Sequence, residues 1–425
     1  MKPKILMLGW EFSPQVSGGV GIACVGIAKA LHSHVDLSVI TPHVKDGDVL
    51  KGAEEFLTEQ VEVSQEYTYQ EFLDVVEQVY PSISPYGNVV NSSYLKKEKI
   101  TRTDTKNFSI EHFYPVGGVQ DEMYQKVLAY TYEAINLGMQ KSFDVIYAHD
   151  WVTFLAGVEL KKRTGKPLVL HIHSLQYDRS GADPKDKGWI YEIERHGMMT
   201  ADLIIAVSAY TANVCEYHYG ILSDNISVVH NGINSVKSYR KENKTKEKVV
   251  VFIGRVTSQK SPNNFLKIAK EILNTNQKVR FVIAGVGDEL AEMKSIVKKS
   301  IELKSKVEFR GHLSRKGIND LLAIADVYCM PSVSEPFGLS ALEAVQFAVP
   351  VVVSRQSGVA EVLSGALVAE YWDVRKMAGH VLELLKNKKI HKKAVETLQK
   401  DVLKLTWENT TQKLLTVMSS KGFIS

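Results

Sequence analysis

The sequence predicts an α/β protein whose two doubly wound, parallel-sheet domains face each other across a cleft. Three observations support this prediction. Short β-branched runs alternate with helix-length segments along most of the chain, which is typical of parallel sheets covered by helices. The 425 residues are too many for one ordinary core, because single cores stop growing near roughly 250 to 300 residues. A highly charged stretch at residues 237–248 separates two halves that share the same rhythm.

Each half supplies its own strands. We expect a first domain at residues 1–238, a linker at 239–248 and a second domain at 249–391. A helical segment at 392–425 completes the chain, and it could leave the second domain and pack back on the first. The expected strands are 4–8, 36–41, 145–148, 168–171, 203–207 and 226–229 in the first domain, and 249–253, 280–284, 306–309, 327–330 and 350–353 in the second.

The rhythm breaks at about residues 46–95, which we expect to be an insertion in the first domain. Residues 46–77 contain ten acidic residues and one lysine. Aromatic rings stack on sugar faces, so the insertion could hold an acceptor glucan, whereas rings at helical spacing are more often packing residues. Both interpretations stay open. The aromatic residues concerned are Tyr67, Tyr69, Phe72, Tyr80 and Tyr86.

Composition narrows the possible functions. The chain has 44% hydrophobic and 24% charged residues, as expected for a globular protein, and its net charge of +4 gives no support to nucleic-acid binding. The first expected strand begins within three residues of Met1, and no stretch of about 18 apolar residues exists, so we expect a cytoplasmic protein without a stable membrane anchor. The three cysteines are widely spaced, which argues against a disulfide or zinc framework.

The strongest local signal is the run PSVSEPFGLS at residues 331–340, which follows a buried strand and leads into a helix. In an open parallel sheet this turn lies at the carboxyl edge of the strands, where ligands bind. The free amides of Gly338, Leu339 and Ser340 would point into the crevice at the positive end of the helix dipole. The turn therefore predicts a phosphate site.

Two glutamates and two cations accompany this turn. Glu335 precedes the helix and Glu343 lies two turns into it, so one could hold a sugar and the other a ribose on opposite sides of a diphosphate. Arg255 and Lys260 follow the strand 249–253 at the same sheet edge. Cleavage of a glycosyl phosphate bond leaves negative charge on the departing nucleotide, and a guanidinium and an ammonium aimed at it would stabilise the transition state.

The first domain offers a glycine pair. Gly18 and Gly19 open an apolar helix after the first strand, where a backbone free of side chains can approach phosphate. The spacing is not that of the dinucleotide fingerprint, because Cys24 stands where a third glycine should be. A nicotinamide enzyme is therefore disfavoured.

Histidines and an aspartate end two further strands of the first domain. Asp150 follows His149, and His171 and His173 point to the same face of their strand. These side chains would line the crevice and could contact a sugar. With His149 or Asp150 the two histidines could instead ligate a metal, so a metal-dependent hydrolase is an alternative function.

Taken together, these residues resemble the retaining glycosyltransferases of family 4 and the neighbouring glycogen and starch synthases, which share the GT-B fold of two Rossmann-like domains. The resemblance spans both halves of the chain. It implies that Arg255 and Lys260 bind the diphosphate. It also implies that Glu335 binds the transferred sugar and that Glu343 binds the ribose. In the first domain, His173 would lie beside the anomeric carbon and Asp150 would orient the acceptor or the sugar. The motifs that carry it are Gly18 with Gly19, His149 to Trp151, His173, Asn231 with Gly232, Arg255 with Lys260, and Glu335 to Glu343.

The resemblance also implies a reaction. ADP-glucose or UDP-glucose would donate a hexose to a glucan or oligosaccharide with retention at the anomeric carbon, no protein nucleophile and neither a metal nor another cofactor. Residues 10–14 and 149–151 favour an α-glucan acceptor, whereas Val16 and Ser17 precede the glycine pair where many glycogen synthases carry a lysine. Ser261 and Asn234 also depart from the usual glycine and aspartate. A small sugar, sugar phosphate or lipid-linked acceptor therefore remains an alternative, as does a binding protein without activity.

Overall fold

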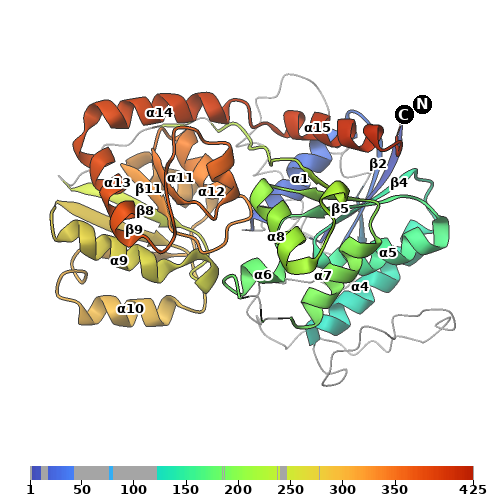
Figure 1. The fold of residues 1–425 in the computed structure, drawn as a ribbon, viewed down its shortest axis with the longest axis horizontal. Coiled ribbons are helices and arrows are strands. Elements are labelled where there is room, and N and C mark those ends of the chain that lie inside the picture. Colours follow the sequence, from blue (N-terminus) through green and yellow to red (C-terminus); the bar gives the residue numbers. More distant parts are fainter. Residues whose placement is uncertain are drawn as a thin grey trace.

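The computed structural model describes residues 2–10, 18–42, 76–79, 122–183, 185, 187–236, 238–239, 247–276 and 278–424. Its strands form two separate parallel sheets, one of seven strands and one of six, each covered by helices (Figure 1). The predicted fold class is thus confirmed. None of the described helices combines the length and the apolar character needed to cross a membrane.

The first sheet has the order β3-β2-β1-β4-β5-β6-β7. Its central strands β4 and β5 are buried along their whole length, as expected for apolar, β-branched runs that carry helices on both faces. The strands are β1 (Lys4–Leu8), β2 (Asp36–Pro42), β3 (Val76–Val79), β4 (Val145–His149), β5 (Leu168–Ile172), β6 (Leu203–Ala206) and β7 (Ile226–Val228). The helices are α1 (Gly19–His32), α4 (Glu122–Gly138), α5 (Trp151–Thr164), α6 (Gln176–Arg179), α7 (Trp189–Thr200) and α8 (Ala209–Tyr219).

The second sheet has the order β10-β9-β8-β11-β12-β13. Its strands are β8 (Lys248–Ile253), β9 (Val279–Ala284), β10 (Val307–Gly311), β11 (Val327–Met330), β12 (Val351–Ser354) and β13 (Leu367–Ala369). The α-helices are α9 (Pro262–Leu273), α10 (Leu290–Lys299), α11 (Arg315–Ile324), α12 (Leu339–Gln346), α13 (Val374–Lys386), α14 (Lys388–Val402) and α15 (Trp407–Ser420). Two short 3-10 helices, η4 (Ser258–Lys260) and η5 (Gly358–Glu361), follow β8 and β12.

Every strand expected from the sequence is present within about two residues, and two more are found. The first, β3, lies inside the expected insertion, whose remaining residues are outside the described part of the chain together with the aromatic residues named for it. The second, β13, is a short edge strand of three residues. The long helix expected near the C-terminus is two helices, α14 and α15, separated by residues 403–406.

The chain crosses between the sheets twice, and the two crossings lie together. Ile233 N donates to Leu405 O at 2.9 Å. A Cβ on Gly232 would lie 2.3 Å from Trp407 N, so only glycine permits this approach. A cavity of about 400 Å³ adjoins the crossings and is lined by Ile233, Val236, Gln346, Val402, Leu405 and Thr406, among others.

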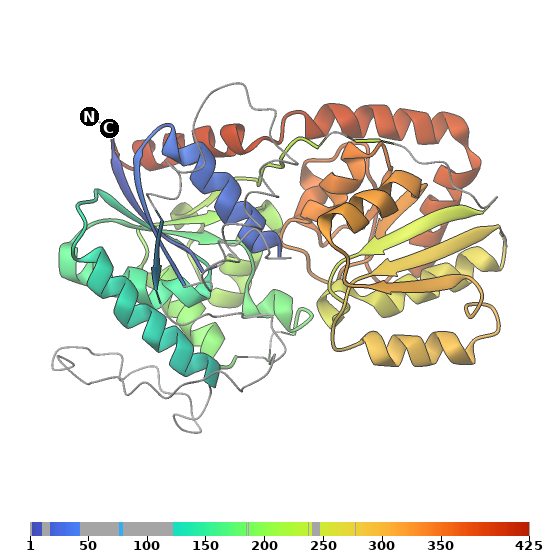
Figure 2. The same cartoon turned by 180° about the vertical axis from the view of Figure 1, so that it is seen from behind.

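The C-terminal helix returns to the first sheet. Figure 2 shows α15, in red, alongside α1, in blue. Trp407, Leu414 and Met418 of α15 belong to the same buried cluster as the core of the first sheet. Tyr239, by contrast, already packs on the second domain. Its ring lies edge-on against Phe347, and its hydroxyl donates to Asp320 at 2.5 Å.

Candidate active site

The turn after β11 ends in a helix whose first amides are free. Gly338 caps α12 with φ of 110°, in the left-handed region that favours glycine. A Cβ there would also lie 3.1 Å from Met330 Cε and 3.3 Å from Val359 Cγ1. Within the described part of the chain, the N–H groups of Gly338, Leu339 and Ser340 donate no hydrogen bond. The start of α12 therefore has the free donors that suit an anion.

Glu335 and Lys260 form an ion pair close to this helix start. They come from the turns after two different strands, β11 and β8, and their side chains are only 8% and 16% exposed. Ser332 Oγ donates a second hydrogen bond to the Glu335 carboxylate at 3.4 Å. The structure thus brings a predicted cation and a predicted carboxylate into direct contact at one sheet edge.

Ser261, next to Lys260, adopts the left-handed conformation, with φ of 49° and ψ of 55°. Residues with a side chain pay roughly 1–2 kcal/mol in this conformation, whereas glycine does not. This is a physical reason for the glycine that the resemblance leads one to expect here. The serine of this chain keeps the same turn at some cost in strain.

Arg255 lies in the loop after β8. Its Nη2 donates to Gln259 Oε1 at 3.0 Å. Tyr328 joins this edge of the sheet to α12, because its hydroxyl donates to Ile253 O at 3.4 Å and shares a hydrogen bond of 2.7 Å with Ser340 Oγ. The loop that carries Arg255 and the start of α12 are therefore held at the same end of the second sheet.

Glu343 lies in α12 and forms an ion pair with Arg315, the first residue of α11. Both side chains are partly exposed, at 17% for Glu343 and 28% for Arg315. No local sequence pattern marks Arg315 as a site residue. A guanidinium partner fixes the direction of the Glu343 carboxylate and leaves it able to accept further hydrogen bonds.

The start of α1 approaches the start of α12 from the first domain. Gly18 is the N-cap residue of α1. A Cβ on Gly19 would lie 3.8 Å from Leu339 Cδ1, which places the two helix starts in contact. The predicted glycine pair and the predicted phosphate turn therefore meet where the two domains face each other.

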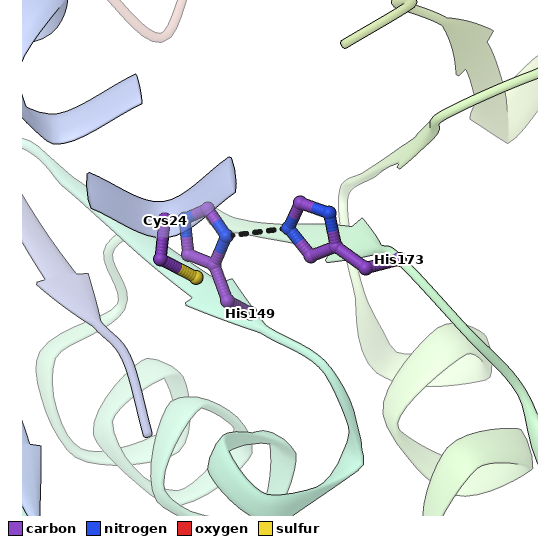
Figure 3. Close-up of side chains that lie close together, drawn as sticks. All are labelled: Cys24, His149 and His173. Atoms are coloured by element: carbon purple, nitrogen blue, oxygen red, sulfur yellow. Dashed lines mark hydrogen bonds between the residues drawn. The ribbon is translucent and has the colours of Figure 1, made fainter. Parts of the chain in front are cut away.

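Figure 3 shows the histidine cluster of the first domain, in which ring nitrogens of His149 and His173 face each other. His149 Nδ1 and His173 Nε2 share a hydrogen bond of 2.9 Å, whose donor depends on the tautomers. Burial lowers the pKa of His173 to about 3, and burial with the neighbouring His173 lowers the pKa of His149 as well. Both rings are thus neutral at pH 7. His173 Nδ1 is buried and has no partner among the described residues, so it can bind a ligand atom.

Asp150 holds the backbone on which His173 lies. It is the N-cap residue of α5 and has a φ of 57°. Its Oδ1 accepts hydrogen bonds from His173 N at 2.7 Å and from Ser174 N at 3.3 Å, whereas its Oδ2 is buried and unpaired in the described structure. Burial raises its pKa to about 8, although these hydrogen bonds and the nearby Arg179 act in the opposite direction. Asp150 therefore has one oxygen available for a ligand.

The metal hypothesis can be compared with these contacts. Cys24, His149 and His173 are the one group within the described ranges whose potential ligand atoms all lie within 4.8 Å of one another. His171 is not part of it, because its Nδ1 bonds to the Tyr147 hydroxyl at 2.6 Å and its ring stacks on His173. The hydrogen bond between His149 and His173 uses one nitrogen of each ring, and His149 Nε2 and His173 Nδ1 stay unpaired within the described residues. The side chains of Cys24, His149 and His173 are therefore a candidate metal site, and turnover without a metal stays a prediction.

Three residues that were not predicted as site residues connect the domains beside Glu335, and they are Ser334, Asp178 and Tyr210. Ser334 Oγ donates to Asp178 Oδ1, and it also shares a hydrogen bond of 2.9 Å with the Tyr210 hydroxyl. Asp178 is buried, and its Oδ2 accepts from Leu175 N at 2.8 Å. Ser334 could have been suspected as the neighbour of Glu335, but no local pattern marks Asp178 or Tyr210.

Two family models match the chain. The model described as Glycosyltransferase Family 4 matches residues 100–237, and the model described as Glycosyl transferases group 1 matches residues 236–401. The two matches meet at the crossing between the sheets. The first match covers strands β4 to β7 of the first sheet, and the second match covers all six strands of the second sheet.

Curated relatives carry related names. An uncharacterised glycosyltransferase of Methanocaldococcus jannaschii is 27% identical over 97% of both chains. An alpha-maltose-1-phosphate synthase of Mycolicibacterium smegmatis is 31% identical, over 52% of this chain and 62% of that protein. A glycogen synthase of Mycobacterium tuberculosis is 27% identical, over 57% of this chain and 60% of that protein.

Solved structures share the fold over almost the whole chain. Sucrose-phosphate synthase from Thermosynechococcus elongatus superimposes with a TM-score of 0.72 at 14% identity, covering 98% of each chain. Anabaena HepE in complex with UDP and glucose gives 0.68 at 16% identity, covering 98% of this chain and 100% of that one. The catalytic domain of Arabidopsis thaliana starch synthase IV, bound to ADP and acarbose, gives 0.67 at 13% identity, covering 99% of each chain. The chain is thus built from the two domains of a glycosyltransferase with the GT-B fold.

Proposed function

We propose that the protein is a retaining hexosyltransferase of family 4, close to the glycogen and starch synthases. It would move glucose from a nucleotide diphosphate sugar to an α-glucan. The observation that carries this proposal is the contact between Lys260 and Glu335 beside the free amides of α12. Cations, free amides and a carboxylate are the groups that a diphosphate and the hydroxyls of its sugar require.

In the proposed reaction, the ammonium of Lys260 turns from Glu335 to the diphosphate of the donor. Arg255 and the amides of Gly338 and Leu339 bind the same group, and Glu335 becomes free to accept hydrogen bonds from the sugar. The bond between C1 and the phosphate oxygen breaks while the acceptor oxygen bonds to C1 on the same face. The proton of the acceptor hydroxyl passes to the leaving phosphate, so no protein nucleophile takes part.

The first domain would complete the site. The unpaired Nδ1 of His173 and the unpaired Oδ2 of Asp150 would bind the sugar or the acceptor. In the second domain, Glu343, oriented by Arg315, would bind the ribose. Related proteins support both nucleotide choices, because the starch synthase IV structure contains ADP and the HepE structure contains UDP. A cytoplasmic location and turnover without a metal stay predictions.

A donor panel tests the proposal. The full chain is incubated with ADP-glucose or UDP-glucose, with and without glycogen, and nucleotide release and incorporation of labelled glucose are measured. We expect release that depends on glycogen, with retention of the α-configuration in the product. Incorporation into a small sugar or a lipid-linked saccharide, but not into glycogen, would replace the α-glucan with that acceptor. Turnover of neither donor with any acceptor would contradict the proposal.

A matched pair of lysine variants tests the site. Lys260→Ala should lower transfer about 10²- to 10³-fold, the usual loss when one stabilising donor is removed. Lys270 is the control, because it lies on α9, ten residues after Lys260, and the one ion pair found for it among the described residues is an exposed pair with Glu302 at 3.8 Å. Lys270→Ala should retain the wild-type rate. Equal rates for both variants would remove Lys260 from the mechanism.

A further inference from the structure

A carboxylate of the second domain caps a helix of the first. Glu361 is the last residue of η5, and its Oε2 and Oε1 accept hydrogen bonds from Ala209 N at 2.9 Å and Tyr210 N at 2.8 Å. These amides belong to the first turn of α8, a helix of eleven residues. His230 Nε2 adds a third contact to Oε2 at 3.0 Å. The side chain of Glu361, in the second domain, thus accepts hydrogen bonds from two amides of the first domain that the start of α8 would otherwise leave unpaired.

The same helix start is held by the turn that carries Glu335. Pro336 O accepts hydrogen bonds from Ser208 Oγ at 2.6 Å and from Thr211 Oγ1 at 3.3 Å. The Tyr210 hydroxyl reaches Ser334 Oγ on the other side of Glu335. The first turn of α8 is therefore hydrogen-bonded to two segments of the second domain, residues 334–336 and η5.

These two segments of the second domain are bonded to each other. Gly358 N donates to Glu335 O at 2.9 Å, and Val359 N donates to Phe337 O at 2.7 Å. A Cβ on Gly358 would lie 2.2 Å from Pro336 O and 2.5 Å from Ser208 Cβ, so the side chain of Ser208 in the first domain packs directly against this glycine. Any movement of η5 relative to α8 is thus passed to the backbone of Glu335.

The charge on Glu361 is matched to this position. Burial alone would raise its pKa, but the hydrogen bonds from His230 and from the amides of Ala209 and Tyr210 outweigh burial and lower the pKa. The carboxylate is therefore ionised at neutral pH, the form that binds most strongly to a helix start. These contacts exist only when the two domains are together, because every donor lies in the first domain or at the crossing and the acceptor lies in the second.

We propose that Glu361 is a positioning residue that closes the second domain on the first and thereby holds the turn that carries Glu335 against the first domain. The closed site excludes water, which limits hydrolysis of the donor in favour of transfer to the acceptor. This role in the reaction rests on the proposed transferase function. The clasp itself, defined as Glu361 with Ala209, Tyr210 and His230, does not.

Domain closure is measured directly by energy transfer between two dyes. Leu222 in the first domain and Ile301 in the second are 73% and 95% exposed, so Leu222→Cys and Ile301→Cys give two labelling sites. The three native cysteines are buried and would not compete. In the full chain, Glu361→Ala should raise the ratio of open to closed molecules about 10-fold or more, in line with the loss of about 1.4 kcal/mol or more of closing free energy.

A matched control and two further variants complete the test. Like Glu361, Glu383 pairs with a histidine, His380 at 4.0 Å, but both residues lie in the second domain. Glu383→Gln should therefore leave the ratio of open to closed molecules unchanged. Glu361→Gln keeps an acceptor oxygen and should fall between the wild type and Glu361→Ala. If Glu361→Ala does not fold, Ser208→Ala, which loses the bond to Pro336 O, should open the domains in the same direction.

Kinetics then connect the clasp to the reaction. Glu361→Ala should increase the fraction of donor lost to hydrolysis rather than transfer by about 10-fold, while Glu383→Gln does not. Unchanged dye distances in Glu361→Ala would overturn the clasp, whatever the enzyme does. Opened domains with an unchanged hydrolysed fraction would overturn the positioning role. Opened domains in a protein that turns over no donor would leave the clasp standing and contradict only the proposed function.

Discussion

The packing of Trp407 on Gly26 gives a prediction whose sign is set by geometry. Gly26 lies in the buried face of α1, and Trp407, which is 6% exposed, is the first residue of α15. A Cβ on Gly26 would lie 2.3 Å from Cε2 of the ring, 2.4 Å from Cδ2 and 2.5 Å from Nε1. Carbon atoms in contact are normally about 3.5–4.0 Å apart, so Gly26→Ala forces either the ring or α1 to move.

The magnitude follows from two opposing effects. Overpacking of a core typically costs about 1–3 kcal/mol, and an overlap of more than about 1 Å with a rigid ring belongs at the upper end. Alanine is more favourable than glycine within a helix by about 1 kcal/mol. We therefore expect Gly26→Ala to destabilise the first domain by about 2 kcal/mol, which lowers its melting temperature by about 4–8 °C for a domain of this size.

Gly379 supplies the matched control. It lies in α13, and a Cβ there would meet nothing within 4 Å. Gly379→Ala should therefore raise stability by about 1 kcal/mol through helix propensity alone. Thermal unfolding of the full chain, followed by circular dichroism, compares the two variants. If Gly26→Ala is as stable as Gly379→Ala, the close packing of α15 on α1 would be refuted.

Three further predictions concern the site. Burial raises the pKa of Asp150 from 3.8 to about 8, so between these pH values the folded protein keeps a proton that the unfolded chain releases. The stability of the fold should therefore fall as pH rises from about 4 to about 8 and then level off. Asp150→Asn should reduce this fall in melting temperature, and parallel pH profiles for the two proteins would contradict the raised pKa. Lys260→Met should cost about 3–5 kcal/mol of stability by leaving Glu335 buried without its partner, and adding Glu335→Gln should restore stability but not transfer. A double variant no more stable than Lys260→Met would rule out this coupling. Finally, transfer should persist after EDTA treatment, and elemental analysis should find no stoichiometric metal. One zinc ion per chain that is lost in Cys24→Ser would favour a metal site instead.

The strands and the turn before α12 were predictable because their signals are local. Apolar β-branched runs must be buried, and a parallel sheet buries both faces of its strands, so the sequence of β4 and β5 already indicates their environment. The start of α12 was predictable in the same way, since a glycine before an apolar helical run marks the point where the helix begins. The break between α14 and α15 was missed, because no glycine or proline stands at residues 403–406 to mark it.

The partners of the site residues depend on distance in space, which no local pattern encodes. The sequence by itself determined the doubly wound class and the residues that follow each strand, because burial and helix capping act over a few neighbouring residues. Only the tertiary structure decided that Lys260 pairs with Glu335, that His149 bonds to His173 and that Glu361 caps α8. These contacts join residues 24 to 152 positions apart. The first two each need the strand order of one sheet, whereas the contact of Glu361 with α8 also needs the two domains to be together.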